Sequence, residues 1–109
     1  MISSSLRRVR RVPKSFKLLG HTITVRIVGK RDWEALADKY EDMEDTVGWW
    51  VPEDNLIVLL RQPRSKLWHT YCHELMHAVL HYANNPLTHD EDFVDLTGAL
   101  LAQALETAR

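Results

Sequence analysis

Hydrophobic and polar positions along this chain of 109 residues follow two different periods, one typical of strands and one of helices. Residues 21–28, HTITVRIV, alternate β-branched apolar and polar side chains, which predicts a strand with one buried face. Residues 56–60, LIVLL, are apolar throughout, which is typical of a strand covered on both faces. Residues 46–51 predict another short strand, which the turn-forming sequence PEDN separates from LIVLL.

Three other segments have the helical period. Residues 32–43 place four apolar side chains at helical spacing, with acidic residues on the opposite side. A longer helix is expected from Ser65, a candidate N-cap, to about Ala83, where the sequence NNP ends it. A last helix is expected over residues 89–106. The order strand, helix, two strands, helix, helix predicts a small α+β domain in which a short antiparallel or mixed sheet packs on the last two helices.

The composition is that of an ordinary folded domain, with 45% hydrophobic and 27% charged residues. A chain of this length can bury a core without disulfides or a structural metal. The single cysteine, Cys72, excludes an internal disulfide and fits a reducing compartment. The first 16 residues have no apolar centre of a secretory signal, and no apolar run is long enough to cross a bilayer. We therefore expect a cytoplasmic protein.

The net charge of −1 suggests neither nucleic acid nor a membrane as a partner. Charge is nevertheless uneven, because residues 7–17 are strongly basic and residues 40–45 are mostly acidic. We interpret residues 1–15 as a flexible basic arm in front of a single domain at 16–109. An arm that binds nucleic acid or an acidic partner loosely is the alternative.

Four histidines recur at every fourth position of the long helix, at His69, His73, His77 and His81. On a helical wheel they share one arc with Thr70, and Glu74 lies at its edge. The opposite arc is apolar and belongs in the core; it contains Leu67, Trp68, Tyr71, Leu75, Ala78, Val79 and Tyr82. Cys72 lies toward this apolar arc and is expected to be a small buried residue.

The pair His73 and His77 has the spacing of a metal site. Residues four apart on a helix have Cβ atoms roughly 6 Å apart, so both imidazoles can converge on one zinc ion. Glu74 lies beside them, close enough to bond a metal-bound water, and completes an H-E-x-x-H motif. His69 and His81 are about 18 Å apart along the axis and cannot join one ion together, so we expect them in surface or supporting roles.

A catalytic zinc site has three protein ligands, and the third must come from outside the motif. The start of the last helix offers five candidates, His89, Asp90, Glu91, Asp92 and Asp95. Glu91 could bind the metal while Asp95, one turn later, holds a ligating imidazole by its second nitrogen. Alternatively, Thr88 and Glu91 match a capping box, in which Glu91 only satisfies the start of the helix.

These residues together resemble a zinc metallopeptidase of the gluzincin type, with His73, Glu74 and His77 matching its first motif and Glu91 and Asp95 its second. Over residues 46–105 the chain is more specifically similar to small phage and prophage proteins, which are predicted minimal metallopeptidases related to the ImmA/IrrE type.

The H-E-x-x-H match is specific and the second motif is loose, with 13 residues between His77 and Glu91, which is short for the group. Leu80 and Ala83 stand where the metzincin group has glycine and histidine. The resemblance implies a zincin-like fold in which LIVLL lies near the cleft and could pair with an extended peptide.

We therefore expect a Zn²⁺-dependent peptidase that acts on a protein or peptide substrate. His73, His77 and Glu91 would hold the metal, and Glu74 would be the general base. An oxyanion donor is expected among His81, Tyr82 and His89. One alternative is a non-catalytic, phage-type regulator whose zinc site joins two helices. Another is a histidine-rich, metal-responsive or nucleic-acid-associated module that uses the basic arm.

Overall fold

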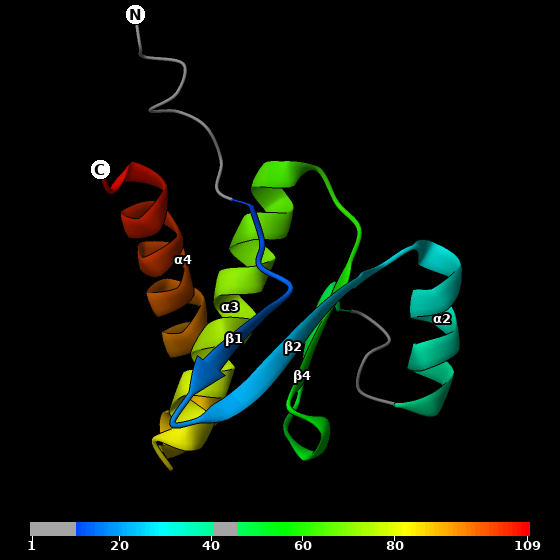
Figure 1. Cartoon of the computed structure of the whole chain (residues 1–109), viewed down its shortest axis with the longest axis horizontal. Helices are drawn as coiled ribbons and strands as arrows, with labels where there is room; N and C mark the ends of the chain where they lie inside the picture. The colour runs from blue at the N-terminus through cyan, green and yellow to red at the C-terminus, as the bar shows by residue number, and fades with distance from the viewer. Residues whose placement is uncertain (1–10, 41–45) are drawn as a thin grey trace, which may run out of the picture.

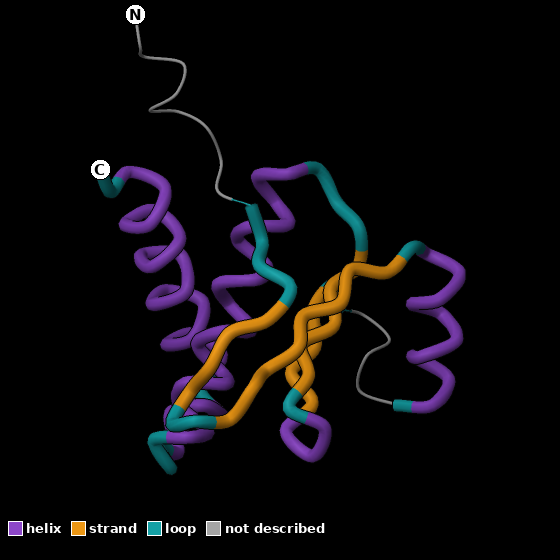
Figure 2. Tube along the Cα trace, in the orientation of Figure 1, coloured by secondary structure: helices purple, strands orange, loops and turns teal. Residues whose placement is uncertain are grey.

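The computed structural model of this chain describes residues 11–40 and 46–109. Within these ranges the chain forms four β-strands, three α-helices and two short 3-10 helices, arranged as Figures 1 and 2 show. In chain order they are β1 (Ser15–Leu18), β2 (His21–Val28), α2 (Lys30–Lys39), β3 (Gly48–Val51), η2 (Pro52–Asp54), β4 (Leu56–Leu60), α3 (Arg64–Tyr82), η3 (Pro86–His89) and α4 (Glu91–Thr107).

The strands form one mixed sheet in the order β1-β2-β4-β3. β2 and β4 are parallel, while β1 and β3 pair antiparallel to β2 and β4 respectively. The predicted α+β class and mixed sheet are therefore confirmed. Because β4 is paired on both sides, the expectation that LIVLL adds an extended peptide is wrong. The sheet has its edges at β1 and β3.

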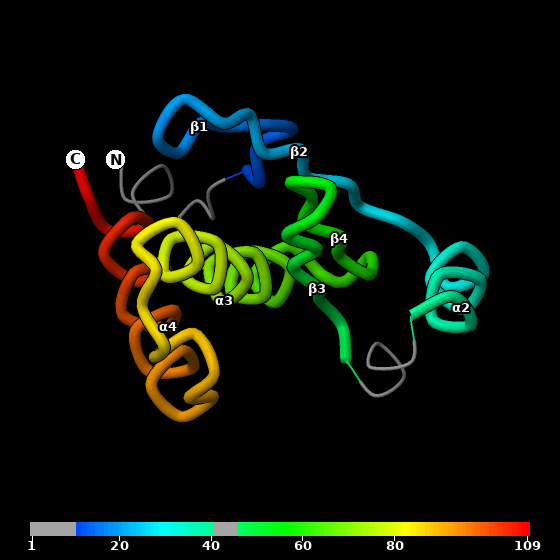
Figure 3. The backbone as a smooth tube through the Cα atoms, turned by 90° about the horizontal axis from the view of Figure 1, so that it is seen from below, coloured from blue at the N-terminus to red at the C-terminus, as the bar shows by residue number. Residues whose placement is uncertain are grey.

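Helices cover the two faces of this sheet. α3 and α4 lie on one side of the strands and α2 on the other, as the two perpendicular views show (Figures 1 and 3). Ile57 and Leu59 of β4 belong to a core cluster with Trp68, Tyr71 and Cys72 of α3. The alternate residue of β4 packs with α2 instead, in a second cluster formed by Val28, Trp33 and Val58. The prediction that LIVLL is covered on both faces is thus confirmed.

The apolar arc of α3 faces the sheet and α4, as predicted. The indole N–H of Trp68 donates a hydrogen bond of 3.2 Å to the carbonyl of Ala102, which ties α3 to α4 inside the core. Cys72 is fully buried, as expected. Val79 is 36% exposed, because it lies at the edge of the arc and not at its centre. None of the helices in the described ranges is long and apolar enough to span a membrane.

The element boundaries differ from the predictions in several places. α3 begins at Arg64 with Pro63 as its N-cap, so Ser65 lies inside the first turn and caps nothing. α2 covers Lys30–Lys39, where the pattern predicted 32–43. β1 was not predicted at all, because SFKL is short and lies at the end of the basic run. Ser15 of the predicted arm belongs to this strand, while residues 1–10 and the acidic residues 41–45 lie outside the described ranges.

The β1–β2 hairpin turns at Leu19 and Gly20, which both have positive φ. Such two-residue turns favour Asn-Gly, since a leucine in the left-handed region is strained. Leu19 is 80% exposed, so burial of its side chain contributes little stability to offset this backbone strain. We expect Leu19→Asn to raise the free energy of unfolding by about 1 kcal/mol, measured by denaturant titration. A variant less stable than the unchanged protein would show that this turn is not strained.

Candidate metal centre

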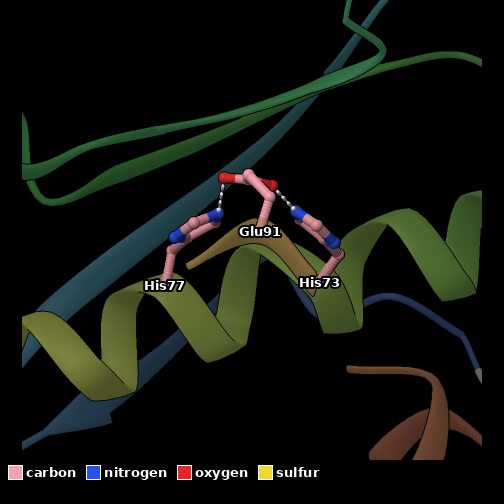
Figure 4. Close-up of side chains that lie close together, drawn as sticks. All are labelled: His73, His77 and Glu91. Carbon is pink, nitrogen blue, oxygen red and sulfur yellow. Dashed lines mark ion pairs between the residues drawn. The ribbon is translucent and has the colours of Figure 1, made fainter. Parts of the chain in front are cut away.

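Helix α3 places His73 and His77 one turn apart on the same side, with ring centroids 5.1 Å apart. Glu91, from the first turn of α4, places its carboxylate between the two rings, and both imidazoles point toward it (Figure 4). The Nε2 atom of His73 lies 3.3 Å from Oε2 of Glu91, and the Nε2 atom of His77 lies 3.2 Å from Oε1. Two elements that are distant in the sequence thus bring three side chains to one point.

These three side chains suit a zinc ion. Their ligand atoms all lie within 4.8 Å of one another. Two ligands, each about 2.0–2.1 Å from a tetrahedral zinc, lie roughly 3.4 Å from each other. The distances from the two imidazole nitrogens to Glu91, 3.3 and 3.2 Å, are close to this value. Two imidazoles and a carboxylate are also a ligand set found in catalytic zinc sites. His73, His77 and Glu91 therefore fit the metal that the sequence predicts, and metal binding itself stays a prediction.

Each imidazole is held by its second nitrogen as well. Nδ1 of His73 lies 2.9 Å from Oδ1 of Asp95, the contact that the sequence predicted for this aspartate. Nδ1 of His77 lies 3.1 Å from the hydroxyl of Thr88. Thr88 is a site residue that the sequence analysis missed, because its spacing before Glu91 matched a capping box. The sequence offered one indication of this role: Thr88 is a hydroxyl residue in the short connection between the two helices that carry the candidate ligands.

The capping-box interpretation of Thr88 and Glu91 is wrong. The N-cap of α4 is Asp90, whose Oδ1 accepts a hydrogen bond of 3.1 Å from the backbone N–H of Phe93. Thr88 belongs to η3, before the helix begins. Glu91 is therefore not a capping-box residue, and its carboxylate instead pairs with both histidines of α3.

Four other side chains that the sequence analysis considered lie outside the group formed by His73, His77 and Glu91. His89 lines the cavity beside the site, and Asp92 is exposed in the first turn of α4. His69 lies 3.7 Å from Glu106, and His81 packs its ring edge-on against Trp50. The metal-competent group found among the described residues contains none of these four predicted side chains.

Glu74, the predicted general base, is buried beside the candidate ligands. It is only 7% exposed, yet it lines the same cavity as the histidines. Burial raises the pKa of its carboxyl to about 8, the negative charge of Glu91 adds to the rise, and a hydrogen bond from the backbone N–H of Trp50 opposes it. Strand β3 approaches closely here, because a Cβ at Gly48 would lie 3.0 Å from Oε2 of Glu74.

The surroundings of His77 lower its pKa and so favour the neutral imidazole. Burial lowers its pKa most strongly, and the neighbouring charge of His73 acts in the same direction. Glu91 and the contact with Thr88 oppose this change without reversing it. A neutral imidazole keeps the lone pair that binds a metal ion.

A cavity of about 890 Å³ lies between α3 and the edge of the sheet. Gly48, Trp49 and Trp50 of β3 line one side, and the four histidines of α3 line the other. Of the three candidate oxyanion donors, His81 and His89 reach this cavity. The hydroxyl of Tyr82 donates a hydrogen bond to Asn55 instead, and Tyr82 does not line the cavity within the described part of the chain.

No family model, curated protein or solved structure matches this chain. The site itself has three features that bear on activity. They are the three convergent candidate ligands, the buried carboxylate of Glu74 and the cavity beside them.

Gly98 controls how closely α4 approaches the site. A Cβ at this position would lie 3.0 Å from the Cα and 3.3 Å from the backbone nitrogen of His73. Alanine normally favours a helix over glycine by about 1 kcal/mol, but here its methyl group must push α4 away from α3. We expect Gly98→Ala to lower the free energy of unfolding by about 1–3 kcal/mol and to weaken zinc binding, because Glu91 moves with α4.

Thermal melts and zinc titrations of this variant test the prediction. Gly29→Ala is the matched control, since a Cβ at Gly29 meets nothing within 4 Å and its φ is −76°. A Gly98→Ala protein with unchanged zinc affinity would mean that the spacing of the two helices does not control the site.

Proposed function

We propose that this chain is a minimal zinc metallopeptidase of the gluzincin type that hydrolyses peptide bonds. The observation that supports it best is the convergence of His73, His77 and Glu91 beside the buried Glu74 in one open cavity. In this proposal the first three residues bind Zn²⁺ and Glu74 acts as the general base. The similarity to small phage and prophage metallopeptidases belongs to the same proposal, as do the zincin-like character of the fold and a cytoplasmic location.

A bound zinc ion supplies an acidified water and a Lewis acid for the scissile carbonyl. Burial favours the protonated form of Glu74, whereas a nearby Zn²⁺ would favour the ionised form. The ionised carboxylate would accept a proton from the attacking water and pass it to the leaving amine. Its burial against β3 excludes competing solvent, and the Trp50 N–H fixes the direction of its carboxylate. Asp95 holds the ring of His73. His81 or His89 stabilises the oxyanion, since both line the cavity.

The substrate of such a site is an extended peptide that lies along β3. The backbone N–H of Leu60 donates to the carbonyl of Val47, so alternate residues of β3 bond to β4. The backbone groups of Gly48 and Trp50 therefore point outward at the sheet edge, and the Trp50 N–H bonds to Glu74. A peptide that pairs with this edge would pass directly over the general base.

A regulator whose zinc site joins two helices is the second candidate function. Glu91 connects α4 to both histidines of α3, so a metal held by these three side chains would join the two helices. A purely structural site has no use for a carboxylate buried beside it, so Glu74 separates the two functions.

We expect the unchanged protein and Glu74→Gln each to contain about one zinc ion per chain, because Glu74 is not among the metal-competent ligands. Hydrolysis of a mixed peptide library should fall by about 100-fold or more in the variant, since the general base is lost. Elemental analysis and mass spectrometry of the digested library measure both quantities.

Glu53→Gln is the matched control for this experiment, because Glu53 is an exposed carboxylate in η2 that is not among the residues lining the cavity in the described part of the chain. Loss of zinc from Glu74→Gln would mean that Glu74 binds the metal. A zinc-containing protein that cleaves no peptide would favour the regulator.

Glu91→Ala should weaken zinc binding severely, because it removes a ligand. Asp95→Ala should weaken it by only about 10–100-fold, the usual effect of removing a group that orients a ligand. Asp92→Ala is the control, since Asp92 is an exposed carboxylate in the same turn. Competition with a zinc-binding dye gives the three affinities. Equal affinities for Glu91→Ala and Asp92→Ala would exclude Glu91 as a ligand.

A further inference from the structure

Thr88 contacts His77 at two atoms. Its hydroxyl lies 3.1 Å from the ring Nδ1 and 3.5 Å from the backbone carbonyl oxygen of the same histidine. The backbone of Thr88 is fixed by η3, where its N–H donates to the carbonyl of Asn85. The side chain of Asn85 in turn accepts a hydrogen bond from the N–H of Leu87, so this short turn holds the hydroxyl in place.

The two candidate ligand histidines differ in the chemistry of the group behind them. His73 has a carboxylate at Nδ1, from Asp95, and a carboxylate can only accept a hydrogen bond. His77 has a hydroxyl at Nδ1, from Thr88, and a hydroxyl can either donate or accept. The ring of His77 can therefore keep its partner in either of its two neutral forms.

The position of Glu91 indicates when the His77 ring would adopt each of its two neutral forms. Without a metal, Nε2 of His77 faces the carboxylate of Glu91 at 3.2 Å, which favours a proton on Nε2. Thr88 then donates its proton to Nδ1. When the lone pair of Nε2 binds a metal ion, the single proton of the neutral ring is on Nδ1. Thr88 then accepts from Nδ1 and turns its own proton to the carbonyl oxygen of His77. The ring exchanges one proton with solvent, and its charge does not change.

We propose that Thr88 is a positioning residue that keeps the His77 ring oriented in both the metal-free and the metal-bound protein, through a hydrogen bond that reverses direction. This role rests on the zinc site proposed above. It also explains how the site gains a second oriented imidazole without another carboxylate in addition to Glu74, Glu91 and Asp95. A further negative charge would weaken the metal as a Lewis acid.

Substitutions of Thr88 test the hydroxyl separately from the shape of the side chain. Thr88→Val keeps the shape and removes the hydroxyl, Thr88→Ala is a second variant without it, and Thr88→Ser restores it. Thr97→Val is the matched control, because among residues 11–40 and 46–109 the hydroxyl of Thr97 bonds to the backbone carbonyls of Phe93 and Val94 in α4.

Zinc affinity by dye competition and long-range ¹⁵N–¹H NMR of the imidazoles are the two measurements. We expect Thr88→Val and Thr88→Ala to bind zinc about 10–100-fold more weakly, while Thr88→Ser and Thr97→Val bind like the unchanged protein. In the zinc-loaded unchanged protein, the spectrum should show the proton of His77 on Nδ1. In Thr88→Val this proton should exchange faster with water.

Two outcomes would overturn the role of Thr88 while the zinc site stands. One is a Thr88→Val protein that binds zinc as tightly as the unchanged chain. The other is a Thr88→Ser protein that binds as weakly as Thr88→Val, since the methyl group would then be the important part. Absence of zinc uptake by the unchanged protein would overturn the zinc site and the role of Thr88 together.

Discussion

The direct contact between the backbones of α3 and α4 is the constraint on which the site depends. Gly98 allows this contact at His73, and the hydrogen bond from Trp68 to Ala102 continues it one turn later. Glu91 and Asp95 share the face of α4 that carries Gly98 and Ala102, at spacings of four, three and four residues. Because that face packs against α3, the carboxylates of Glu91 and Asp95 lie beside the histidines. The convergence of the three candidate ligands is therefore a product of helix packing.

The sheet supplies the other half of the site. Its two core clusters fix β4 between α2 and α3, and β4 in turn holds β3 at the open edge. Gly48 lets that edge approach Glu74, so the carboxylate is buried beside the cavity and not inside the core. The two helices thus bring the candidate ligands together. The edge of the sheet brings the backbone of Trp50 into contact with Glu74, the proposed general base.

Sequence alone predicted the features that depend on local spacing. The turn of a helix sets the distance between His73 and His77, and the four-residue spacing relates Glu91 to Asp95 in the same way. Alternation and apolar runs predicted β2, β3 and β4 for the same reason. What escaped prediction depends on packing between distant segments: the order of the strands, the contact at Gly98 and the path of η3 that brings Thr88 to His77. Local spacing contains no information on these contacts.

X-ray absorption spectroscopy at the zinc edge, on protein loaded with one equivalent of zinc, tests the central claim most directly. The account predicts two imidazole ligands with the remaining positions taken by oxygen, at about 2.0–2.1 Å. A sulfur neighbour at about 2.3 Å would implicate Cys72, which is fully buried in the core, and would contradict the site. A shell of oxygen atoms alone, without imidazole scattering, would contradict it equally, because neither His73 nor His77 would then bind the metal.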